Sequence, residues 1–537
     1  MTVLTGGQVL VRCLEREGVK VVFGMPGINV LDLYDGLRES SIRHVSVRHE
    51  QAAAFMADAY ARVTGKPGVC VTTAGPGLTN ALTGLATSYS DSVPVLALAG
   101  EISSNLIGRK KGVLHEIDQT SLSRPVAAKS YCIMSCGDIP RVMEQAFDDL
   151  RKERVRPVYV GLPEDVLEAT SDFNLEEKQS PSRTSLVINS ESLREAADLL
   201  SHSHFPVILA GGGVASSNAS PELVEVAQLL GAPVITTIMG AGSIPSDHPL
   251  FLCRSRMPGV VDEVFRKADV MLAVGTRFSS LSMNRWALKV PENLIHVDID
   301  RGEIGKNYPA RIGIYGDARA VLGEIAVKLQ SMPKSDRSDW RKTWEGLRDS
   351  VWQEMKRSNP IEVEVIAGIR NVLERNAIVA ADTTIPSYWM QRIFPIYEPR
   401  TYLYPFGYVA MGYALPAAIA AKIAFPGRQV VAVCGDGGFM VTCQELATAV
   451  ENRLGIPILL HNNGGYGVLR HFQDIHFEGR RFAVDLLNPD FAKLAESFGA
   501  RSCLAETVEQ IGSCLRDALR SDLPTIVEFR MPFSPPH

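Results

Sequence analysis

The chain has 537 residues, of which 46% are hydrophobic and 21% are charged, and its formal net charge is −5. This composition is typical of a soluble globular protein, and the weakly acidic balance excludes the basic surface that nucleic-acid binding requires. The length exceeds what one hydrophobic core supports, so we expect three domains of about 150–200 residues.

The amino-terminal residues 1–24 read as a helix and then a strand, without a charged leader before a long apolar run. No signal peptide is therefore predicted. The most apolar stretch, residues 413–427, is interrupted by Pro416, Lys422 and Pro426 and is too short to span a bilayer. The nine cysteines form no zinc pattern, which favours reduced thiols in a cytoplasmic protein without a membrane partner.

Along the chain, short β-branched runs alternate with helical patterns in three successive segments. This rhythm predicts an α/β fold of three doubly wound parallel-sheet domains, in which helices cross between the strands. A helix is predicted over residues 49–65. The principal predicted strands are residues 19–24, 66–77, 94–100 and 156–163, then 205–213, 232–240, 269–278 and 294–300, and finally 377–382, 429–438, 456–463 and 525–529.

Two polar stretches separate these three segments. Residues 167–187 and residues 329–340 are rich in charged side chains, serine and proline, as linkers between domains commonly are. We therefore predict domains at residues 1–166, 187–330 and 355–537.

The third segment contains a glycine-rich turn at the end of a predicted strand, where Asp436 stands among three glycines. Glycines at a strand end allow the backbone to approach a phosphate closely and to direct its amide groups at it. Taken alone, such a sequence is more often an ordinary turn. The glycines expected beside a phosphate are Gly435, Gly437 and Gly438.

A second polar group follows the next predicted strand, since 24 residues separate Gly437 from the pair Asn462-Asn463. A carboxylate and an amide oxygen at the ends of neighbouring parallel strands can converge on Mg²⁺, which prefers oxygen ligands shared with phosphates. The predicted metal ligands are Asp436, the side-chain oxygen of Asn463 and the backbone carbonyl of Gly465. This spacing resembles the signature that binds thiamine diphosphate (ThDP) and its magnesium ion.

Glu50 stands at the start of the predicted helix 49–65, directly after a strand. An isolated glutamate at this position is ordinarily explained by the favourable helix dipole. In ThDP enzymes, a glutamate in this His-Glu context faces N1′ of the cofactor's aminopyrimidine. The resemblance therefore implies that Glu50 exchanges a proton with the cofactor.

Nearly the whole chain, from Leu4 to about Phe529, resembles the acetolactate synthase large-subunit group of ThDP enzymes. The resemblance implies a pyrimidine-binding, a middle and a diphosphate-binding domain. It also implies decarboxylation of a 2-oxo acid to a cofactor-bound enamine, which is then joined to a second carbonyl or protonated. The matching segments are residues 23–27, 48–62, 72–100, 274–278, 297–307, 411–424, 435–450 and 487–500.

Further site residues follow from this resemblance, position by position. Met411 matches the apolar residue that supports the bent form of ThDP, and the Val409 carbonyl matches the acceptor for its 4′-amino group. Loops over the pyrimidine match at Pro26, Gly27, Gly75, Pro76 and Asn80, which would otherwise be ordinary turns.

Arg277 matches an arginine thought to bind a substrate carboxylate, for which a guanidinium offers bidentate geometry. The alternative for Arg277 is a salt bridge at a domain interface. The resemblance also implies a homodimer or a dimer of dimers, in which Glu50 of one chain and Asp436 of another serve one cofactor.

The middle segment departs from the synthases that carry FAD. Residues 251–259 read FLCRSRMPG in place of a glycine-rich turn, and Ser279, Ser280 and Leu281 replace the usual Asp-Asp-Arg. A glycine triplet at residues 211–213 is weak support for a dinucleotide. We therefore expect a middle domain without FAD.

The substrate region departs from the synthases as well. His115 lies in a Leu-His-Glu sequence where they have Phe-Gln-Glu, and Phe472 replaces a tryptophan that selects the second oxo acid. The Leu-His-Glu sequence, together with the Thr-Gly-Gly-Gln run at Thr5–Gln8, resembles a catabolic branch that includes 5-guanidino-2-oxopentanoate decarboxylases. His115 is then either an acid–base group or a neutral structural histidine. The basic segment 470–481 argues against a cationic substrate.

Two other classes of function compete with this one. A nicotinamide or flavin oxidoreductase requires a glycine fingerprint with an acid about 20 residues further on, and residues 211–216 lack its third glycine. A non-catalytic partner with a ThDP fold predicts loss of Glu50 or of a metal ligand, and all of these are present. The expected small-molecule partner is therefore a 2-oxo acid.

Overall fold

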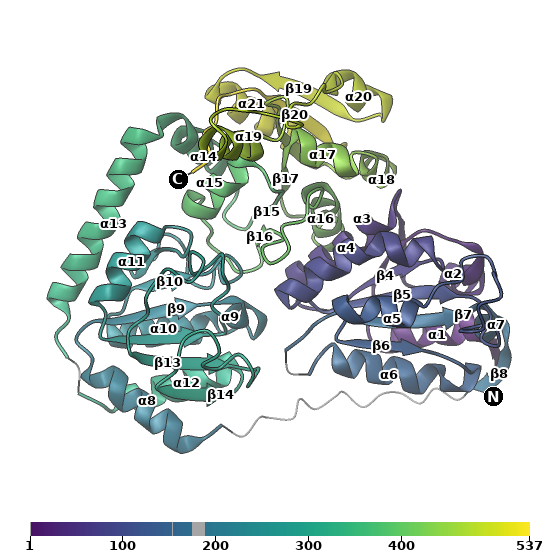
Figure 1. The fold of residues 1–537 in the computed structure, drawn as a ribbon, viewed down its shortest axis with the longest axis horizontal. Coiled ribbons are helices and arrows are strands. Elements are labelled where there is room, and N and C mark those ends of the chain that lie inside the picture. The colour runs from purple at the N-terminus through teal and green to yellow at the C-terminus, as the bar shows by residue number, and fades with distance from the viewer. Residues whose placement is uncertain (1, 153, 174–187, 334, 537) are drawn as a thin grey trace.

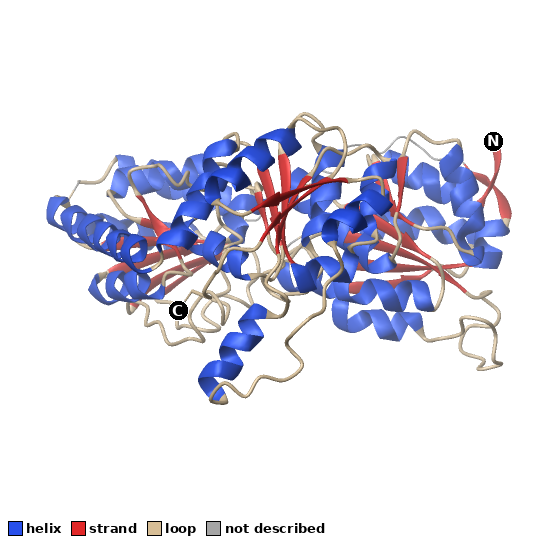
Figure 2. Ribbon diagram, turned by 90° about the horizontal axis from the view of Figure 1, so that it is seen from above, coloured by secondary structure: helices blue, strands red, loops and turns tan. Residues whose placement is uncertain are grey.

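Three α/β domains lie side by side in the computed structural model, which describes all residues except 1, 153, 174–187, 334 and 537 (Figure 1). Each domain is built on a six-stranded sheet whose neighbouring strands are all parallel. Helices cover both faces of the sheets, as Figure 2 shows from above. The predicted fold class is therefore confirmed.

The first domain contains a sheet in the order β3-β2-β4-β5-β7-β6. Its helices α3 and α4 pack against each other at the boundary with the third domain. The strands are β2 (Val21–Gly24), β3 (Arg43–Ser46), β4 (Gly68–Thr72), β5 (Val95–Glu101), β6 (Lys129–Cys132) and β7 (Val158–Pro163). The helices are α1 (Gly6–Arg16), α2 (Leu31–Arg38), α3 (Glu50–Thr64), α4 (Pro76–Asp91), α5 (Gln119–Ser123), α6 (Ile139–Asp149) and α7 (Glu164–Glu168).

Strand β1 (Thr2–Thr5) pairs antiparallel with β8 (Thr170–Phe173). The ordered structure of the first domain thus extends beyond the predicted boundary at residue 166, because β8 uses part of the segment interpreted as a linker. The rest of that linker, residues 174–187, lies outside the described residues.

The middle domain has the strand order β11-β10-β9-β12-β13-β14. The strands are β9 (Pro206–Ala210), β10 (Val234–Thr236), β11 (Phe251–Arg254), β12 (Val270–Val274), β13 (Asn293–Asp298) and β14 (Ile312–Tyr315). The helices are α8 (Ser190–His202), α9 (Gly212–Ser216), α10 (Ser220–Leu230), α11 (Pro258–Lys267) and α12 (Ala318–Gln330). Helix α13 (Ser338–Ser358) leads to the third domain and buries Trp340 and Trp344 in the middle-domain core.

The third domain has the strand order β16-β15-β17-β18-β20-β19. The strands are β15 (Ile378–Ala381), β16 (Tyr402–Leu403), β17 (Val430–Gly435), β18 (Pro457–His461), β19 (Arg501–Ala505) and β20 (Thr525–Phe529). The helices are α14 (Pro360–Val372), α15 (Ile385–Ile393), α16 (Ala414–Ala424), α17 (Asp436–Thr442), α18 (Glu445–Glu451), α19 (Gly467–His476), α20 (Phe491–Ser497) and α21 (Val508–Leu519).

The first and third domains share one hydrophobic core, in which α3 packs on α16. Both helices are rich in alanine, and small side chains allow two helix backbones to approach closely. Phe55 and Tyr413 meet edge to face in this core, with ring centroids 5.4 Å apart. The two domains that carry the predicted site residues are therefore held together within one chain.

The prediction of free thiols is wrong for two cysteines. Cys503 on β19 and Cys514 on α21 are joined in a disulfide, because the helix packs beside the strand and brings their Cα atoms to 6.2 Å. The other seven cysteines are free thiols. Within the described part of the chain, no helix is both long and apolar enough to cross a membrane.

Candidate active site

Glu50 and Asn80, both predicted from the family resemblance, are in direct contact. Glu50 is the first residue of α3, where the His49 side chain caps the helix by accepting a hydrogen bond from the Gln51 amide. The Asn80 side chain, one turn into α4, donates a hydrogen bond to Glu50 Oε2 over 2.9 Å. Glu50 is only 8% exposed. A poorly solvated carboxylate held by a single amide is suited to exchange a proton with a ligand.

The turn before α4 brings Gly75 next to His115. Gly75 has a φ of +60°, which glycine adopts without strain, and Pro76 begins the helix. A Cβ on Gly75 would stand 3.0 Å from the His115 side chain. The Gly75 amide donates to Gln119 Oε1 over 2.8 Å, so this buried glutamine, which the sequence did not single out, fixes the turn.

His115 lies in a polar cluster with Asn29. Its Nδ1 is 3.3 Å from Asn29 Oδ1, and Asn29 Nδ2 donates to Glu164 Oε2 over 2.9 Å. Thr73 also donates to Asn29, and a Cβ on Gly27 would collide with Thr73, so the predicted loop at Gly27 lies in this cluster. His115 has a φ of +66°. His115 therefore lies close to the predicted pyrimidine loops. This position is compatible both with an acid–base group and with a neutral structural histidine.

Pro26, which precedes Gly27, is exposed, as is Pro76. Both prolines therefore border the cluster at the surface of the first domain.

Asp436 lies at the carboxyl end of β17 and is 2% exposed. Its Oδ1 accepts from the Gly437 amide over 2.8 Å, and its Oδ2 accepts from the Gly465 amide over 2.9 Å. The side chain of Asn488 also donates to Oδ2 over 2.7 Å. Two predicted metal ligands, Asp436 and Gly465, are thus neighbours, and Asn488 is a further member that no local sequence pattern indicated.

Asn463 completes this group. Its side-chain Oδ1 is buried and has no hydrogen-bond partner, which is costly for a polar atom. The Gly465 carbonyl accepts from the Gly467 amide over 3.0 Å and keeps a second lone pair. An amide oxygen without a partner and a buried carboxylate on the same edge of the sheet are oxygen ligands suited to Mg²⁺. The cation would share its remaining positions with the oxygens of a diphosphate. The residues present therefore fit Mg²⁺ and ThDP.

Three glycines lie at the carboxyl end of β17, where neighbouring side chains approach them closely. A Cβ on Gly435 would stand 2.7 Å from Thr384, and one on Gly438 would stand 2.9 Å from Asp382. A Cβ on Gly437 would stand 2.6 Å from the ring of Tyr466. All three glycines of this cradle are buried and closely packed, and their predicted contact with a phosphate stays a prediction.

Arg470 holds the Asn463–Gly465 turn from the other side. Its guanidinium donates to the carbonyls of Asn463, over 2.8 Å, and of Gly464, and its Nε donates to Asp485 over 2.7 Å. The sequence predicted only a basic segment here. In the structure this arginine organises the candidate metal site, and its charge is paired.

Val409 has a φ of +56°, a left-handed conformation that β-branched residues rarely adopt. Such a conformation costs about 1–3 kcal/mol and persists only where its surroundings impose it. It lies in the segment that joins β16 to α16, two residues before the half-buried Met411. The strain thus falls on the residue whose carbonyl was predicted to accept a hydrogen bond from the cofactor.

Phe472 lies on α19, none of whose residues is buried. This helix projects from the body of the molecule at the lower edge of Figure 2. Phe472 is 47% exposed, and its ring lies 6.0 Å from that of His476. The predicted substrate contact of Phe472 stays a prediction.

Arg277 lies at the junction of the three domains rather than beside His115 or Phe472. Its Nη2 is 3.0 Å from where a Cβ on Gly407 would stand, and burial next to Arg154 lowers its pKa. This position favours the interpretation as a domain-interface arginine. The predicted carboxylate contact stays a prediction.

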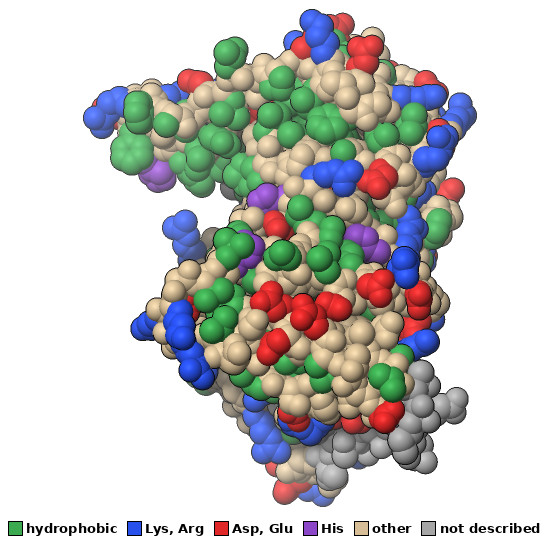
Figure 3. Space-filling model, turned by 90° about the vertical axis from the view of Figure 1, so that its right-hand side faces the viewer, with side chains coloured by type: hydrophobic (Ala, Val, Ile, Leu, Met, Phe, Trp, Pro, Cys, Tyr) green, Lys and Arg blue, Asp and Glu red, His purple; other side chains and the backbone are tan. Residues whose placement is uncertain are grey.

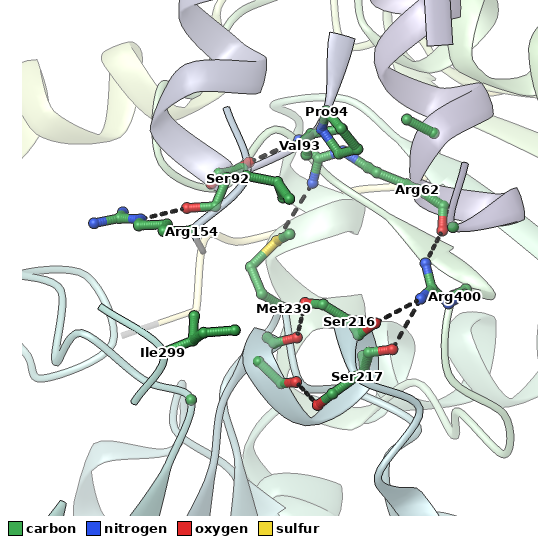
Figure 4. A pocket seen from close by; sticks show the side chains of 18 of the residues that line it. Arg62, Ser92, Val93, Pro94, Arg154, Ser216, Ser217, Met239, Ile299 and Arg400 are labelled. Atoms are coloured by element: carbon green, nitrogen blue, oxygen red, sulfur yellow. Dashed lines mark hydrogen bonds and ion pairs between the residues drawn. The ribbon is translucent and has the colours of Figure 1, made fainter. Parts of the chain in front are cut away.

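A cavity of about 1210 Å³ opens at this junction. It lies at the carboxyl ends of the paired strands β9 and β12, where the strand order of the sheet reverses, which is the usual ligand position in such sheets. Figure 4 shows Arg62, Met239 and Arg400 around it, with Arg400 donating to the Ser216 carbonyl. Gly212 also lines the cavity. The middle domain thus has room for a ligand, and the expected absence of FAD stays a prediction.

The fold and the site define a three-domain enzyme with a phosphate-binding and cation-binding strand edge and a separate buried glutamate. Models of the thiamine pyrophosphate enzyme family match in all three domains: the N-terminal TPP-binding domain over residues 4–122, the central domain over 193–325 and the C-terminal TPP-binding domain over 382–529. The chain belongs to the thiamine pyrophosphate enzyme family.

Individual relatives cover almost the whole chain. It is 37% identical to the "Probable acetolactate synthase large subunit" of Methanocaldococcus jannaschii, covering 98% of this chain and 91% of that protein. It is 36% identical to an acetolactate synthase large subunit of Mycobacterium tuberculosis, covering 98% and 88%. It is also 37% identical to the "Probable 2-ketoarginine decarboxylase AruI" of Pseudomonas aeruginosa, covering 98% and 94%. Both branches suspected from the sequence are therefore confirmed as relatives.

Proposed function

We propose that this enzyme decarboxylates a 2-oxo acid with ThDP and Mg²⁺, and then either joins the remaining fragment to a second carbonyl compound or protonates it. The observation that carries the proposal is the unpartnered, buried Oδ1 of Asn463 close to Asp436 and the glycine cradle. A protein without such a ligand would leave this oxygen unsatisfied at a cost.

Different residues of the chain would bind the cation and the diphosphate. Asp436, Asn463 and the Gly465 carbonyl would hold the cation, while Gly435, Gly437 and Gly438 let the backbone approach the diphosphate.

On the pyrimidine side, Glu50 would exchange a proton with N1′, the Val409 carbonyl would accept a hydrogen bond from the 4′-amino group and Met411 would pack against the cofactor. When bound, ThDP supplies a nucleophilic carbon and the electron sink that decarboxylation requires. Asn80 orients Glu50 for this proton exchange.

The proposed assembly is a homodimer or a dimer of dimers, in which each cofactor lies between Glu50 of one chain and Asp436 of another. Large exposed apolar side chains in the first and third domains support it, since Leu114, next to His115 in the chain, is 71% exposed and Phe482 is 84% exposed. Figure 3 shows hydrophobic side chains gathered on the upper half of one face, where a lobe projects over a hollow. The proposed location in the cytoplasm rests on the sequence alone.

A decarboxylase of a guanidino oxo acid is the second candidate. The basic segment 470–481 argued against a cationic substrate from the sequence. In the structure, Arg470 pairs with Asp485 and Arg481 pairs with Asp474, over 2.6 Å and 2.7 Å. These pairs offset two of the three arginine charges in the segment and weaken the objection to a cationic substrate, so this branch remains a candidate.

The reaction products distinguish a synthase from a decarboxylase. We would follow the purified enzyme with ThDP and Mg²⁺, without added FAD, by proton NMR on pyruvate and on 5-guanidino-2-oxopentanoate. Acetolactate formed from pyruvate establishes a synthase that works without FAD. Untouched pyruvate with 4-guanidinobutanal formed from the second acid establishes the decarboxylase. No conversion of either acid, or of a wider panel of 2-oxo acids, would contradict the proposed function.

A further inference from the structure

The segment between β16 and α16 must hold an unfavourable backbone conformation. Val409 is in the left-handed region at φ +56°, and Gly412 follows at φ +83°. The Val409 amide is turned back and donates to the Pro405 carbonyl over 2.7 Å. Because a β-branched residue does not favour this conformation by itself, contacts outside the segment must impose it.

The first anchor comes from another domain. Asp91, the last residue of α4, has a side chain that is 1% exposed. Its Oδ1 accepts a hydrogen bond from the Gly407 amide over 2.8 Å, and its Oδ2 accepts one from Arg62 Nη2 over 2.9 Å. Arg62 also donates to the Tyr404 carbonyl over 3.3 Å. A buried ion pair of the first domain thus holds the beginning of the segment in two places.

The second anchor lies within the third domain. Asp382, directly after β15, accepts from the Gly412 amide through Oδ2 over 2.9 Å. The hydroxyl of Thr442 donates to the Gly412 carbonyl over 2.9 Å. Val409 is therefore fixed between two buried carboxylates. Asp382 also lies against the cradle at Gly438, so of these two carboxylates Asp91 is the one that acts on the segment from outside the phosphate site.

We propose that Asp91, oriented by Arg62, is a positioning residue that holds the Val409 carbonyl where it meets the cofactor. This inference rests on the proposed function. Helix α4 carries Asn80 near its start and Asp91 at its end, so the helix that orients Glu50 also shapes the Val409 segment. Its 16 residues span about 24 Å, so in the proposed dimer one rigid helix connects the Glu50 that serves one cofactor to the Val409 segment that serves the other.

The test compares Asp91→Ala, Asp91→Asn and, as a matched control, Asp35→Ala on the exposed face of α2. In the ThDP-free protein, hydrogen exchange over residues 404–412 should accelerate about tenfold in Asp91→Ala, the factor for one net hydrogen bond. In the loaded enzyme, exchange of the thiazolium C2 proton for deuterium should slow by about tenfold or more. The dissociation constant of ThDP should change by less than about threefold.

Two further variants keep the test decisive if Asp91→Ala does not fold. Asp91→Asn is isosteric and still accepts from Gly407, so its C2 exchange should slow by only about threefold. Val409→Gly, added to either Asp91 variant, should restore C2 exchange to within about twofold, because glycine adopts the left-handed conformation freely.

C2 exchange at the wild-type rate in the Asp91 variants, a parallel loss of ThDP affinity, or no rescue by Val409→Gly would overturn the positioning role. Failure of the proposed function has a different signature, because the wild-type protein itself would then bind no ThDP. The amide exchange of the ThDP-free protein would still report on the Asp91 anchor.

Discussion

Asn80 donates a hydrogen bond to the Glu50 carboxylate over 2.9 Å, and this contact joins the start of α3 to the first turns of α4. The carboxylate is nearly buried, so the amide of Asn80 replaces part of the water that would otherwise solvate it. The orientation of the carboxylate that is proposed to exchange a proton with the cofactor is thus set before any ligand binds. Four predictions follow from the two groups around Glu50 and Asp436, and a fifth tests the reaction itself.

Glu50→Gln should leave ThDP binding within about threefold of the wild type but reduce turnover by about 10²–10⁴-fold, because the amide cannot take up the proton. Turnover and ThDP affinity, the latter from quenching of intrinsic fluorescence, measure the two effects separately. Near-normal turnover would remove Glu50 from the proposed mechanism.

Asp436→Ala should weaken Mg²⁺ and ThDP together by about 100-fold or more, because the site loses its only predicted carboxylate ligand. The control is Asp517→Ala, an exposed carboxylate on α21 of the same domain. Calorimetric titration of both variants measures the affinities. Equal cofactor affinities for the two variants would show that Asp436 does not bind the metal.

Mixing the two inactive variants tests whether the site is shared between chains. A hybrid of a Glu50→Gln chain and an Asp436→Ala chain contains one site with both lesions and one with neither. Random reassembly should therefore recover up to about a quarter of the wild-type activity. If both residues served the same site within one chain, every site would carry a lesion and the mixture would stay inactive.

Asp382 should make the stability of the ThDP-free protein fall as the pH rises. Burial raises the pKa of Asp382 to about 6, which backbone amides only partly offset. The folded protein then holds this proton more tightly than the unfolded chain, whose aspartates titrate near 3.9. The free energy of unfolding therefore loses about 3 kcal/mol as the pH rises from about 4 to above 6.

Urea unfolding of wild type and Asp382→Asn across this range measures the effect. The asparagine stays neutral at every pH, so the difference between the two proteins should shrink at low pH and grow toward pH 7. Parallel curves for the two proteins would contradict the raised pKa.

Much of the fold could be predicted because each buried parallel strand appears in the sequence as a short run of apolar residues. The runs at residues 429–438 and 456–463 became β17 and β18, with Asp436 and Asn463 at their ends as expected. Short strands were harder, since β16 has two residues and depends on pairing with β15 rather than on its own pattern.

The supporting residues of the site could not be predicted in the same way. Asn488 reaches Asp436 from 52 residues further along the chain, and Asp91 reaches Gly407 from another domain. No local periodicity encodes such contacts, because the first arises only when the third domain folds and the second only when two domains pack together. Asp382 could have been suspected, since it is an acid at the carboxyl end of a predicted strand, next to the one that leads to Asp436.

The most direct test of the account is the release of carbon dioxide from 2-oxo acids labelled with ¹³C at C1, pyruvate and 5-guanidino-2-oxopentanoate being supplied together. We expect labelled bicarbonate only when ThDP and Mg²⁺ are both present, and release at least about 100-fold slower from Glu50→Gln. Absence of labelled bicarbonate, or release that proceeds equally without ThDP, would contradict the assignment of this site to 2-oxo acid decarboxylation.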